Sequence, residues 1–171
     1  DAISEFYKEY NSNVHRGLYP WAEKSTSMYE ITRNKIADYI NAKNNCLIFT
    51  KGTTESINFI SNAWGQNNVT KGDNIVITEM EHHSNIIPWQ ILSQKTGAEL
   101  RYIPISDNGE LILDNLNQII DSNTKIVSII HQSNVFGTIN PIEKIILAAK
   151  NNGALTLVDA AQSVAHQVID V

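Results

Sequence analysis

The alternation of helix-like and strand-like segments is the feature that most constrains this fold. Short apolar runs alternate with longer segments whose apolar residues recur at helical spacing. Strands are predicted at 46–50, 74–78, 99–103, 125–131, 154–159 and 166–171, and helices at 53–64, 86–96, 113–120 and 141–151. This order is typical of parallel βα units. We therefore predict an α/β fold with a mostly parallel sheet and helices on both faces.

The N-terminal part follows a different pattern. Helices are predicted at 2–10 and 25–42, with an irregular stretch at 11–21 that contains Gly17 and Pro20. We expect an N-terminal helical and loop segment at 1–43, followed by a sheet-bearing domain at 44–171. The chain stops directly after a strand-like segment, without the polar end that most domains have. We therefore expect the sheet-bearing domain to be incomplete.

Composition excludes several functional classes. With 18 acidic and 13 basic residues the formal charge is −5, which argues against nucleic acid as a partner because phosphate backbones require a basic face. No apolar stretch approaches the ~20 residues of a membrane span, and the first residues lack the pattern of a signal peptide, so we expect a cytoplasmic protein. The single cysteine, Cys46, lies in an apolar run. It is predicted to be a buried structural thiol and not a nucleophile.

Two segments after strand-like runs carry polar residues suited to a phosphorylated aromatic ligand. The first, at 51–55, reads Lys-Gly-Thr-Thr-Glu; a glycine turn before Thr53 and Thr54 at a helix start can present amides and hydroxyls to one anion. The second, at 81–85, reads Glu-His-His-Ser-Asn. Adjacent histidines do not face one metal, whereas one imidazole can lie against an aromatic ring and move protons. The alternatives are an ordinary helix cap and an exposed loop.

Two further segments complete the pattern. Asp159 ends the apolar run 154–158, where a carboxylate is costly unless a partner such as a protonated pyridine nitrogen pairs with it. Gln162 could donate to a phenolic oxygen, and Asn134 in the loop 131–138 could bind a cofactor or a substrate carboxylate. Turn and cap roles are the alternatives. Together the four loops predict a pyridoxal-phosphate pocket at one edge of the sheet.

The same four segments, in the same order, closely resemble the cysteine desulfurases, which are class V aminotransferase-like enzymes of fold type I. The stretch 81–89, Glu-His-His-Ser-Asn-Ile-Ile-Pro-Trp, together with Asn-Val-His-Arg-Gly at 13–17, is similar to the SufS/CsdA branch more than to the IscS/NifS branch. The resemblance covers essentially the whole chain. It implies the large-domain fold of these enzymes and pyridoxal 5′-phosphate as the cofactor.

The resemblance also implies roles for individual residues. Thr53 and Thr54 would hold the cofactor phosphate. His82 would stack on the ring and assist proton transfer, with His83 behind it. The other implied cofactor contacts are those of Asn134 and Gln162 around the phenolic oxygen and of Asp159 with the ring nitrogen. The implied reaction converts L-cysteine to L-alanine in a homodimer, and a persulfide on an enzyme cysteine passes sulfur to a SufE/SufU-like acceptor for iron–sulfur cluster assembly.

The chain also departs from the family pattern. The Schiff-base lysine of the family lies in a Ser-x-His-Lys segment one strand beyond the aspartate, and no lysine follows Lys150 here. The family's nucleophilic cysteine and substrate-binding arginine lie later still. We therefore expect weak cofactor binding, no desulfurase activity from the isolated chain, and self-association through an open sheet edge. The alternatives are a selenocysteine lyase or other class V enzyme, a catalytically dead phosphate-binding domain, and a fragment without function.

Overall fold

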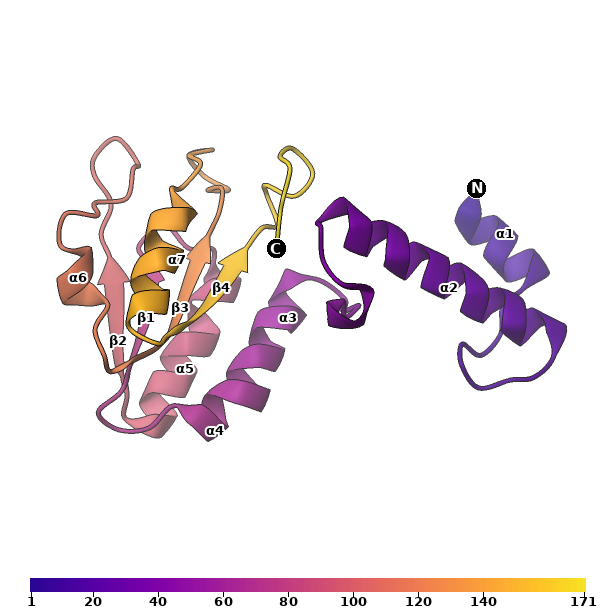
Figure 1. Cartoon of the computed structure of the whole chain (residues 1–171), viewed down its shortest axis with the longest axis horizontal. Helices are drawn as coiled ribbons and strands as arrows, with labels where there is room; N and C mark the ends of the chain where they lie inside the picture. The colour runs from indigo at the N-terminus through magenta and orange to yellow at the C-terminus, as the bar shows by residue number, and fades with distance from the viewer. The chain divides into compact units, whose positions relative to one another are not determined.

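The structure is a computed structural model that describes residues 1–171 without gaps. It contains two compact units (Figure 1). One unit comprises Asp1–Phe49 with Val168–Val171, and the other comprises Thr50–Gln167. No helix in the structure is long and apolar enough to cross a membrane.

The larger unit is built on a four-stranded sheet. Its strands are β1 (Asn74–Thr78), β2 (Glu99–Ile103), β3 (Thr124–Ile130) and β4 (Leu155–Asp159), arranged in the order β2-β1-β3-β4. All three neighbouring pairs are parallel. The predicted α/β fold with a parallel sheet is therefore confirmed, and the four predicted strands from 74 to 159 agree with the structure to within one residue at each end.

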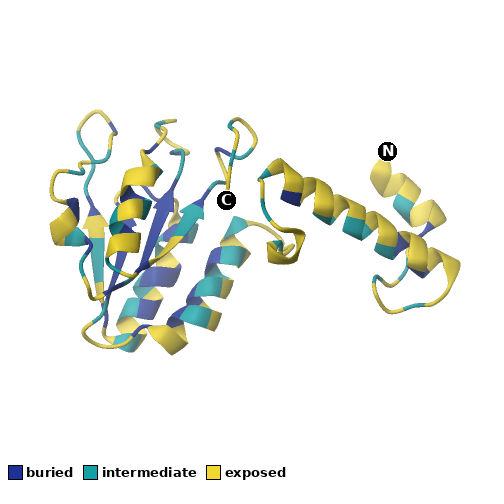
Figure 2. Cartoon of the chain, viewed as in Figure 1, coloured by how far each residue is buried: buried dark blue, intermediate teal, exposed yellow.

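Helices cover both faces of the sheet, as predicted (Figure 2). One face is covered by α3 (Thr53–Ile60), the π-helical turn η2 (Ser61–Gly65), α4 (Gln66–Asn68) and α5 (Ile87–Thr96). In the sequence, β1 lies between α4 and α5. On the other face lie α6 (Leu116–Ile119) and α7 (Ile142–Asn151). Successive residues of β1 divide between the two cores, because side chains alternate across a strand: Ile75 and Ile77 pack with Trp89, and Val76 packs with Ile145.

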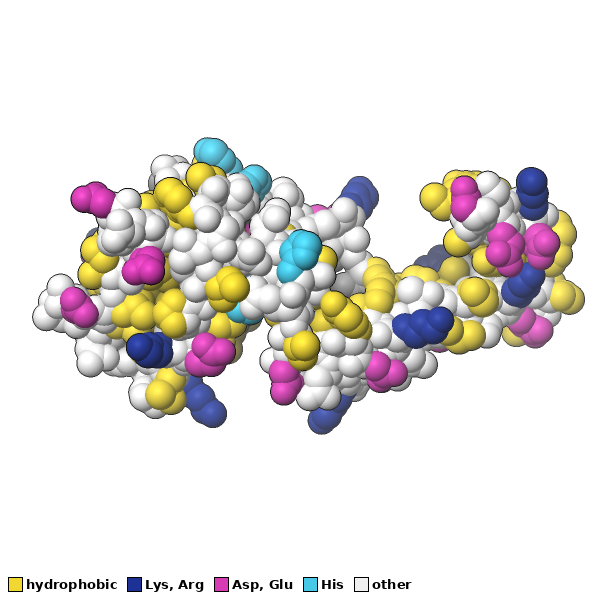
Figure 3. Space-filling view, turned by 90° about the horizontal axis from the view of Figure 1, so that it is seen from above, with side chains coloured by type: hydrophobic (Ala, Val, Ile, Leu, Met, Phe, Trp, Pro, Cys, Tyr) yellow, Lys and Arg dark blue, Asp and Glu magenta, His cyan; other side chains and the backbone are white.

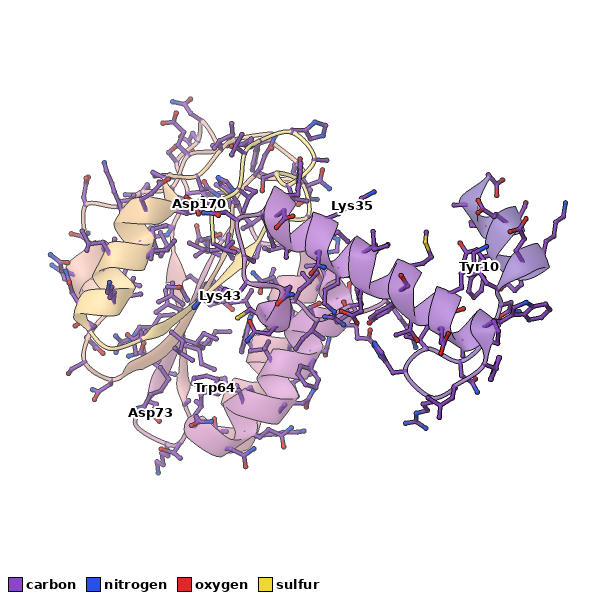
Figure 4. The ribbon with its side chains drawn as sticks, turned by 45° about the vertical axis from the view of Figure 1, so that its right-hand side comes forward. Tyr10, Lys35, Lys43, Trp64, Asp73 and Asp170 are labelled. Carbon is purple, nitrogen blue, oxygen red and sulfur yellow. The ribbon has the colours of Figure 1, made fainter.

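The end of the sheet where the strands begin is stabilised by charged pairs. Arg101 binds Asp121 at 2.7 Å, and Lys125 lies 3.4 Å from Asp73. Figure 4 labels Asp73 at this end of the sheet. These pairs do not involve the loops that follow Thr78, Ile130 and Asp159. Those loops lie at the other end of the sheet, which remains open to a ligand.

The chain order places a topological switch at that ligand edge. From β1 the chain moves outward to β2, and it returns to the other side of β1 to form β3 and then β4. Loops after β1 and β3 therefore diverge, which opens a crevice at the carboxyl ends of these strands. The 3₁₀ turn η3 (His83–Asn85) lies in the loop after β1.

The smaller unit corrects the predicted start of the second helix. Its helices are α1 (Ala2–Glu9) and α2 (Pro20–Tyr39), followed by the 3₁₀ turn η1 (Asn44–Cys46). The second helix begins at Pro20 and not near residue 25, because proline at the first helical position has no N–H to leave unpaired. In Figure 4, Tyr10 lies between the two helices, and its side chain is buried.

The predicted strand at 46–50 is wrong, and so is the predicted burial of Cys46. Cys46 is exposed and ends the turn η1. The residues after it find no strand partner: the Leu47 carbonyl accepts a hydrogen bond from the Arg33 guanidinium instead. The Phe49 ring lies 5.0 Å from the Tyr29 ring, edge to face. An apolar run becomes a strand only beside another strand.

The predicted strand at 166–171 is also wrong. Residues 161–167 form successive turns, in which the Ser163 N–H donates to the Ala160 carbonyl at 3.0 Å. Farther on, Val171 N–H donates to Ile40 O, and Asp170 accepts from Asn41 at 2.7 Å. These residues thus pair with the end of α2 and not with a strand.

Candidate functional site

A cavity of about 180 Å³ opens at the carboxyl edge of the sheet. All six residues singled out in the sequence line it: Thr53, Thr54, His82, Asn134, Asp159 and Gln162. Ser84, Ile130 and Ala161 complete the lining. Figure 3 views the molecule from above this edge, and histidine side chains are exposed on this face. Four chain segments thus meet at one site because each follows a strand or begins a helix at the same edge.

Thr53 and Thr54 form the first turn of α3. Gly52 precedes them with a φ of +154°, a backbone conformation that favours glycine. The N–H groups of a first helical turn have no partner within the helix and point out of its end. The nearby Glu55 carboxylate bonds back to the Lys51 N–H at 2.6 Å. Amides, hydroxyls and the positive end of the helix dipole therefore converge on the cavity, where they can hold a phosphate.

The His82 ring is held in a defined tautomer by Ser84. Its Nδ1 accepts from the Ser84 N–H at 3.2 Å and lies 2.8 Å from the Ser84 hydroxyl oxygen. Because a backbone N–H can only donate, Nδ1 carries no proton and Nε2 bears the proton of the neutral ring. The His83 ring is perpendicular to that of His82, at 6.0 Å, and does not line the cavity. His82 therefore presents Nε2–H as a proton donor.

Asn134 lies at the tip of the turn that follows β3. The Ser133 hydroxyl oxygen accepts the N–H groups of Val135 and Phe136, at 3.3 and 3.1 Å, and Gly137 adopts a φ of +74°. These contacts close the turn without the side chain of Asn134. The side-chain amide of Asn134 is thus exposed in the cavity lining and does not stabilise the turn, which was the alternative role in the sequence analysis.

Asp159 ends β4 and is 3% exposed. Its Oδ1 accepts the Ala161 N–H at 3.0 Å, so it does cap the following turn, and the carboxylate also lines the cavity. A nearly buried carboxylate facing a cavity is costly without a cationic or donor partner. Gln162 lies three residues on, exposed beside the same cavity. Asp159 therefore caps the turn through Oδ1 and also lines the cavity.

Sequence reasoning missed a buried polar network beneath the cavity. Glu81, which is 7% exposed, accepts from Thr78 Oγ1 at 2.7 Å, from Ile130 N at 2.8 Å and from Asn85 Nδ2 at 2.6 Å. Burial raises the pKa of Glu81 to about 7; the three hydrogen bonds oppose this rise, and the charge of Asp159 adds to it. The only sequence signal was the position of Glu81 directly before the two histidines.

One N-terminal cap also differs from expectation. The helix predicted at 141–151 begins at Ile142, and Pro141 is its cap residue. The Asn140 amide donates instead to the Ile130 carbonyl at 2.8 Å. Asn140 therefore fixes the end of β3, next to the cavity, and not the helix.

Comparison with known proteins identifies the family. The aminotransferase class-V model matches residues 1–171. A probable cysteine desulfurase of Streptomyces coelicolor is 47% identical over 176 aligned positions, which cover all of this chain and 42% of that protein. A cysteine desulfurase of Salmonella choleraesuis is 46% identical, again with 42% of its length covered. The chain thus spans about two fifths of these relatives.

Solved structures agree with the sequence comparison. The apo cysteine desulfurase of Thermococcus onnurineus superposes with a TM-score of 0.94 at 39% identity, over 99% of this chain and 42% of that one. The Escherichia coli cysteine desulfurase CsdA superposes with a TM-score of 0.87 at 32% identity, over 98% and 42%. The resemblance predicted from the four segments is therefore confirmed. This chain belongs to the class-V aminotransferase family, and its relatives there are cysteine desulfurases.

Proposed function

We propose that this chain is the pyridoxal-phosphate-binding part of a cysteine desulfurase of the SufS/CsdA type. The observation that carries the proposal is the convergence of six residues from four segments on one cavity. Its donor set fits the cofactor at three points: a helix N-terminus for the phosphate, a neutral imidazole for the ring face and a buried carboxylate for the ring nitrogen. The whole enzyme would act on L-cysteine as a homodimer.

The six residues would divide four tasks among them. Thr53 and Thr54 would bind the phosphate, and Asp159 would hold the ring nitrogen in its protonated form. Asn134 and Gln162 would donate to the phenolic oxygen. When bound, the cofactor supplies an electron sink for bonds broken at the substrate α-carbon. His82, with its proton on Nε2, would move a proton at the face of the ring.

The later steps would use residues that this chain does not contain. The proposed reaction leaves L-alanine and passes sulfur, as a persulfide on an enzyme cysteine, to a SufE/SufU-like acceptor protein. Cys46 is not that cysteine, because it lies in the turn η1 and does not line the cavity. In this proposal the 171-residue chain contributes the cofactor pocket and the acid–base residue.

Equilibrium dialysis with pyridoxine 5′-phosphate tests the pocket directly. This alcohol has the ring and phosphate of the cofactor but no aldehyde that would react with exposed lysines. We expect saturable binding that inorganic phosphate competes away. Replacing both Thr53 and Thr54 by valine should weaken binding about tenfold or more, since two hydroxyl donors to a charged group are lost. The exposed pair Thr32 and Thr156, which does not line the cavity, provides the control when replaced in the same way. If replacing Thr53 and Thr54 leaves binding unaffected, the proposal is contradicted.

A second prediction concerns activity. No lysine lines the cavity of this chain, so neither covalent capture of the cofactor nor an amine for proton transfer is available there. We expect the chain, supplied with pyridoxal phosphate and L-cysteine, to release sulfide and alanine no faster than the free cofactor does. A rate above that background, reduced by His82→Ala, would show that the chain is active by itself.

A further inference from the structure

Glu81 is a buried carboxylate to which the proposed mechanism assigns no role. It lies in the loop between β1 and η3, one residue before His82, and does not itself line the cavity. Such a group is costly to bury unless donors surround it. Its three hydrogen bonds and its position beside the cavity together indicate what it does.

The first contact joins the loop after β1 to the end of β3. The Ile130 N–H donates to Glu81 Oε1 at 2.8 Å, across 49 residues of sequence. Ile130 is the last residue of β3 and lies beyond the described pairing with β1, which ends at Val76 and Val127. The carboxylate thus takes the place of a strand partner. It fixes the loop of His82 to a residue that lines the cavity and pairs with Asp159 in the sheet.

The second contact shows which form of Glu81 the site accommodates. The indole N–H of Trp89 donates to Asn85 Oδ1 at 2.9 Å, and the Ser128 hydroxyl lies 2.6 Å from the same oxygen. Because an indole N–H can only donate, the orientation of the Asn85 amide is set. Its Nδ2 must therefore face Glu81 Oε2, as it does at 2.6 Å. Both carboxylate oxygens meet N–H donors, an arrangement suited to a negative charge.

The third observation links Glu81 to the ligand site. Ile130, whose N–H donates to Glu81, pairs with Asp159 in the sheet, and the charge of Asp159 adds to the rise in the pKa of Glu81. Two carboxyl groups that repel each other are both ionised most readily when a cation lies near them. The cavity that Asp159 lines is where such a cation would sit.

We propose that Glu81 is a specificity-determining residue, an inference that rests on the proposed function. Together with Asp159, Glu81 supplies a second negative charge at the ring-nitrogen end of the pocket. This charge favours a ligand whose ring nitrogen is protonated. Asp159 contacts that nitrogen. Glu81 acts from behind, through the field of its charge. A purely structural Glu81 would instead support all ligands of the same shape equally.

The test compares two ligands of the same shape. One is pyridoxine 5′-phosphate, and the other is its carbocyclic analogue, in which a C–H group replaces the ring nitrogen. The ratio of their dissociation constants measures the contribution of that nitrogen. We expect Glu81→Gln to reduce the preference for the pyridine ring about fivefold, because the charge of Glu81 acts on the ring nitrogen without direct contact. Asp159→Asn should remove most of the preference.

A double variant separates charge from hydrogen bonding. In Glu81→Gln alone, the new amide cannot accept from both the Ile130 N–H and Asn85 Nδ2, because one of its two terminal groups is an NH₂ donor. Adding Asn85→Asp gives the new amide at position 81 an acceptor again. It also moves the negative charge to position 85, which contacts Ser128, two residues before Ile130 in β3. We expect this variant to recover affinity for the carbocyclic analogue while its preference for the pyridine ring stays below that of the unmodified chain.

The outcomes distinguish the inference from the function on which it rests. Equal loss of affinity for both ligands in Glu81→Gln, or full recovery of the ratio in the double variant, would overturn the role of the Glu81 charge while leaving the cofactor site intact. If the unmodified chain binds neither ligand, the proposed function itself fails, and this inference fails with it.

Discussion

Replacing Asp159 by asparagine is expected to weaken binding of pyridoxine 5′-phosphate by roughly tenfold to a hundredfold. The reason is that a nearly buried carboxylate, 3% exposed, would lose its charge-assisted hydrogen bond to the protonated ring nitrogen, a bond of about 1.5–3 kcal/mol. Asparagine keeps an oxygen for the Ala161 N–H that Asp159 Oδ1 accepts. The turn after β4 should therefore persist, and the loss should be electrostatic. Isothermal calorimetry measures it.

Inorganic phosphate provides the internal control for this variant. Phosphate needs the first turn of α3 but not the carboxylate, so its affinity should be unchanged or slightly higher in Asp159→Asn. Asp114→Asn, at an exposed position away from the cavity, should leave both ligands unaffected. If Asp159→Asn binds the pyridine ligand as tightly as the unmodified chain, Asp159 is only a turn cap.

The free energy of unfolding is expected to fall by about 3 kcal/mol between pH 4.5 and a little above pH 7 because of Glu81. Its pKa rises from an ordinary 4.5 to about 7 on folding, chiefly through burial. The folded protein therefore binds the Glu81 proton more tightly than the unfolded chain. The stabilising effect is complete below the unfolded pKa and is lost as the pH rises through the folded pKa. Glu81→Gln cannot ionise, so its stability should lack this slope.

Other shifted carboxyl groups act outside that window and with the opposite sign. Burial alone would raise the pKa of Asp73, but hydrogen bonds from Thr70 and the charge of Lys125 hold it below its usual range. A hydrogen bond from Arg101 does the same for Asp121. Their contributions are present above the ordinary carboxyl pKa of 3.8 and are lost only at lower pH.

Urea unfolding at a series of pH values measures the effect of Glu81. In a Trp21→Phe background, the remaining tryptophans, Trp64 and Trp89, both report on the sheet-bearing unit. Glu79→Gln, two residues before Glu81 and not buried, is the matched control and should keep the slope. Identical slopes for Glu81→Gln and the unmodified chain would show that Glu81 does not titrate in this range.

Local sequence patterns made much of the fold and of the candidate site predictable. The apolar runs at β1 to β4 and the helical spacing between them were enough to predict the sheet, because each strand finds its partner through the regular βα order. The cavity residues were predictable for the same reason. Each follows a strand or begins a helix at the carboxyl edge, so a linear order of Thr53, His82, Asn134 and Asp159 becomes a cluster once the strands are parallel.

The errors have a common physical origin. Residues 46–50 and 166–171 have strand-like patterns, but a strand is stabilised by hydrogen bonds to a neighbour. Leu47 O is bonded to Arg33 instead, and Val171 N to Ile40 O. Cys46 was predicted to be buried because it lies in that apolar run, and it is exposed because the run has no sheet to join.

The sequence by itself determined which groups could serve a pyridoxal-phosphate site, because the glycine turn, the histidine and the strand-ending aspartate are local features. Only the tertiary structure decided how they are supported. The contact of Glu81 with Ile130 spans 49 residues, and that of Asn85 with Ser128 spans 43. Both depend on how far β1 and β3 extend past each other in the sheet, which no local pattern encodes. A buried carboxylate is tolerated only where that register brings three donors to it.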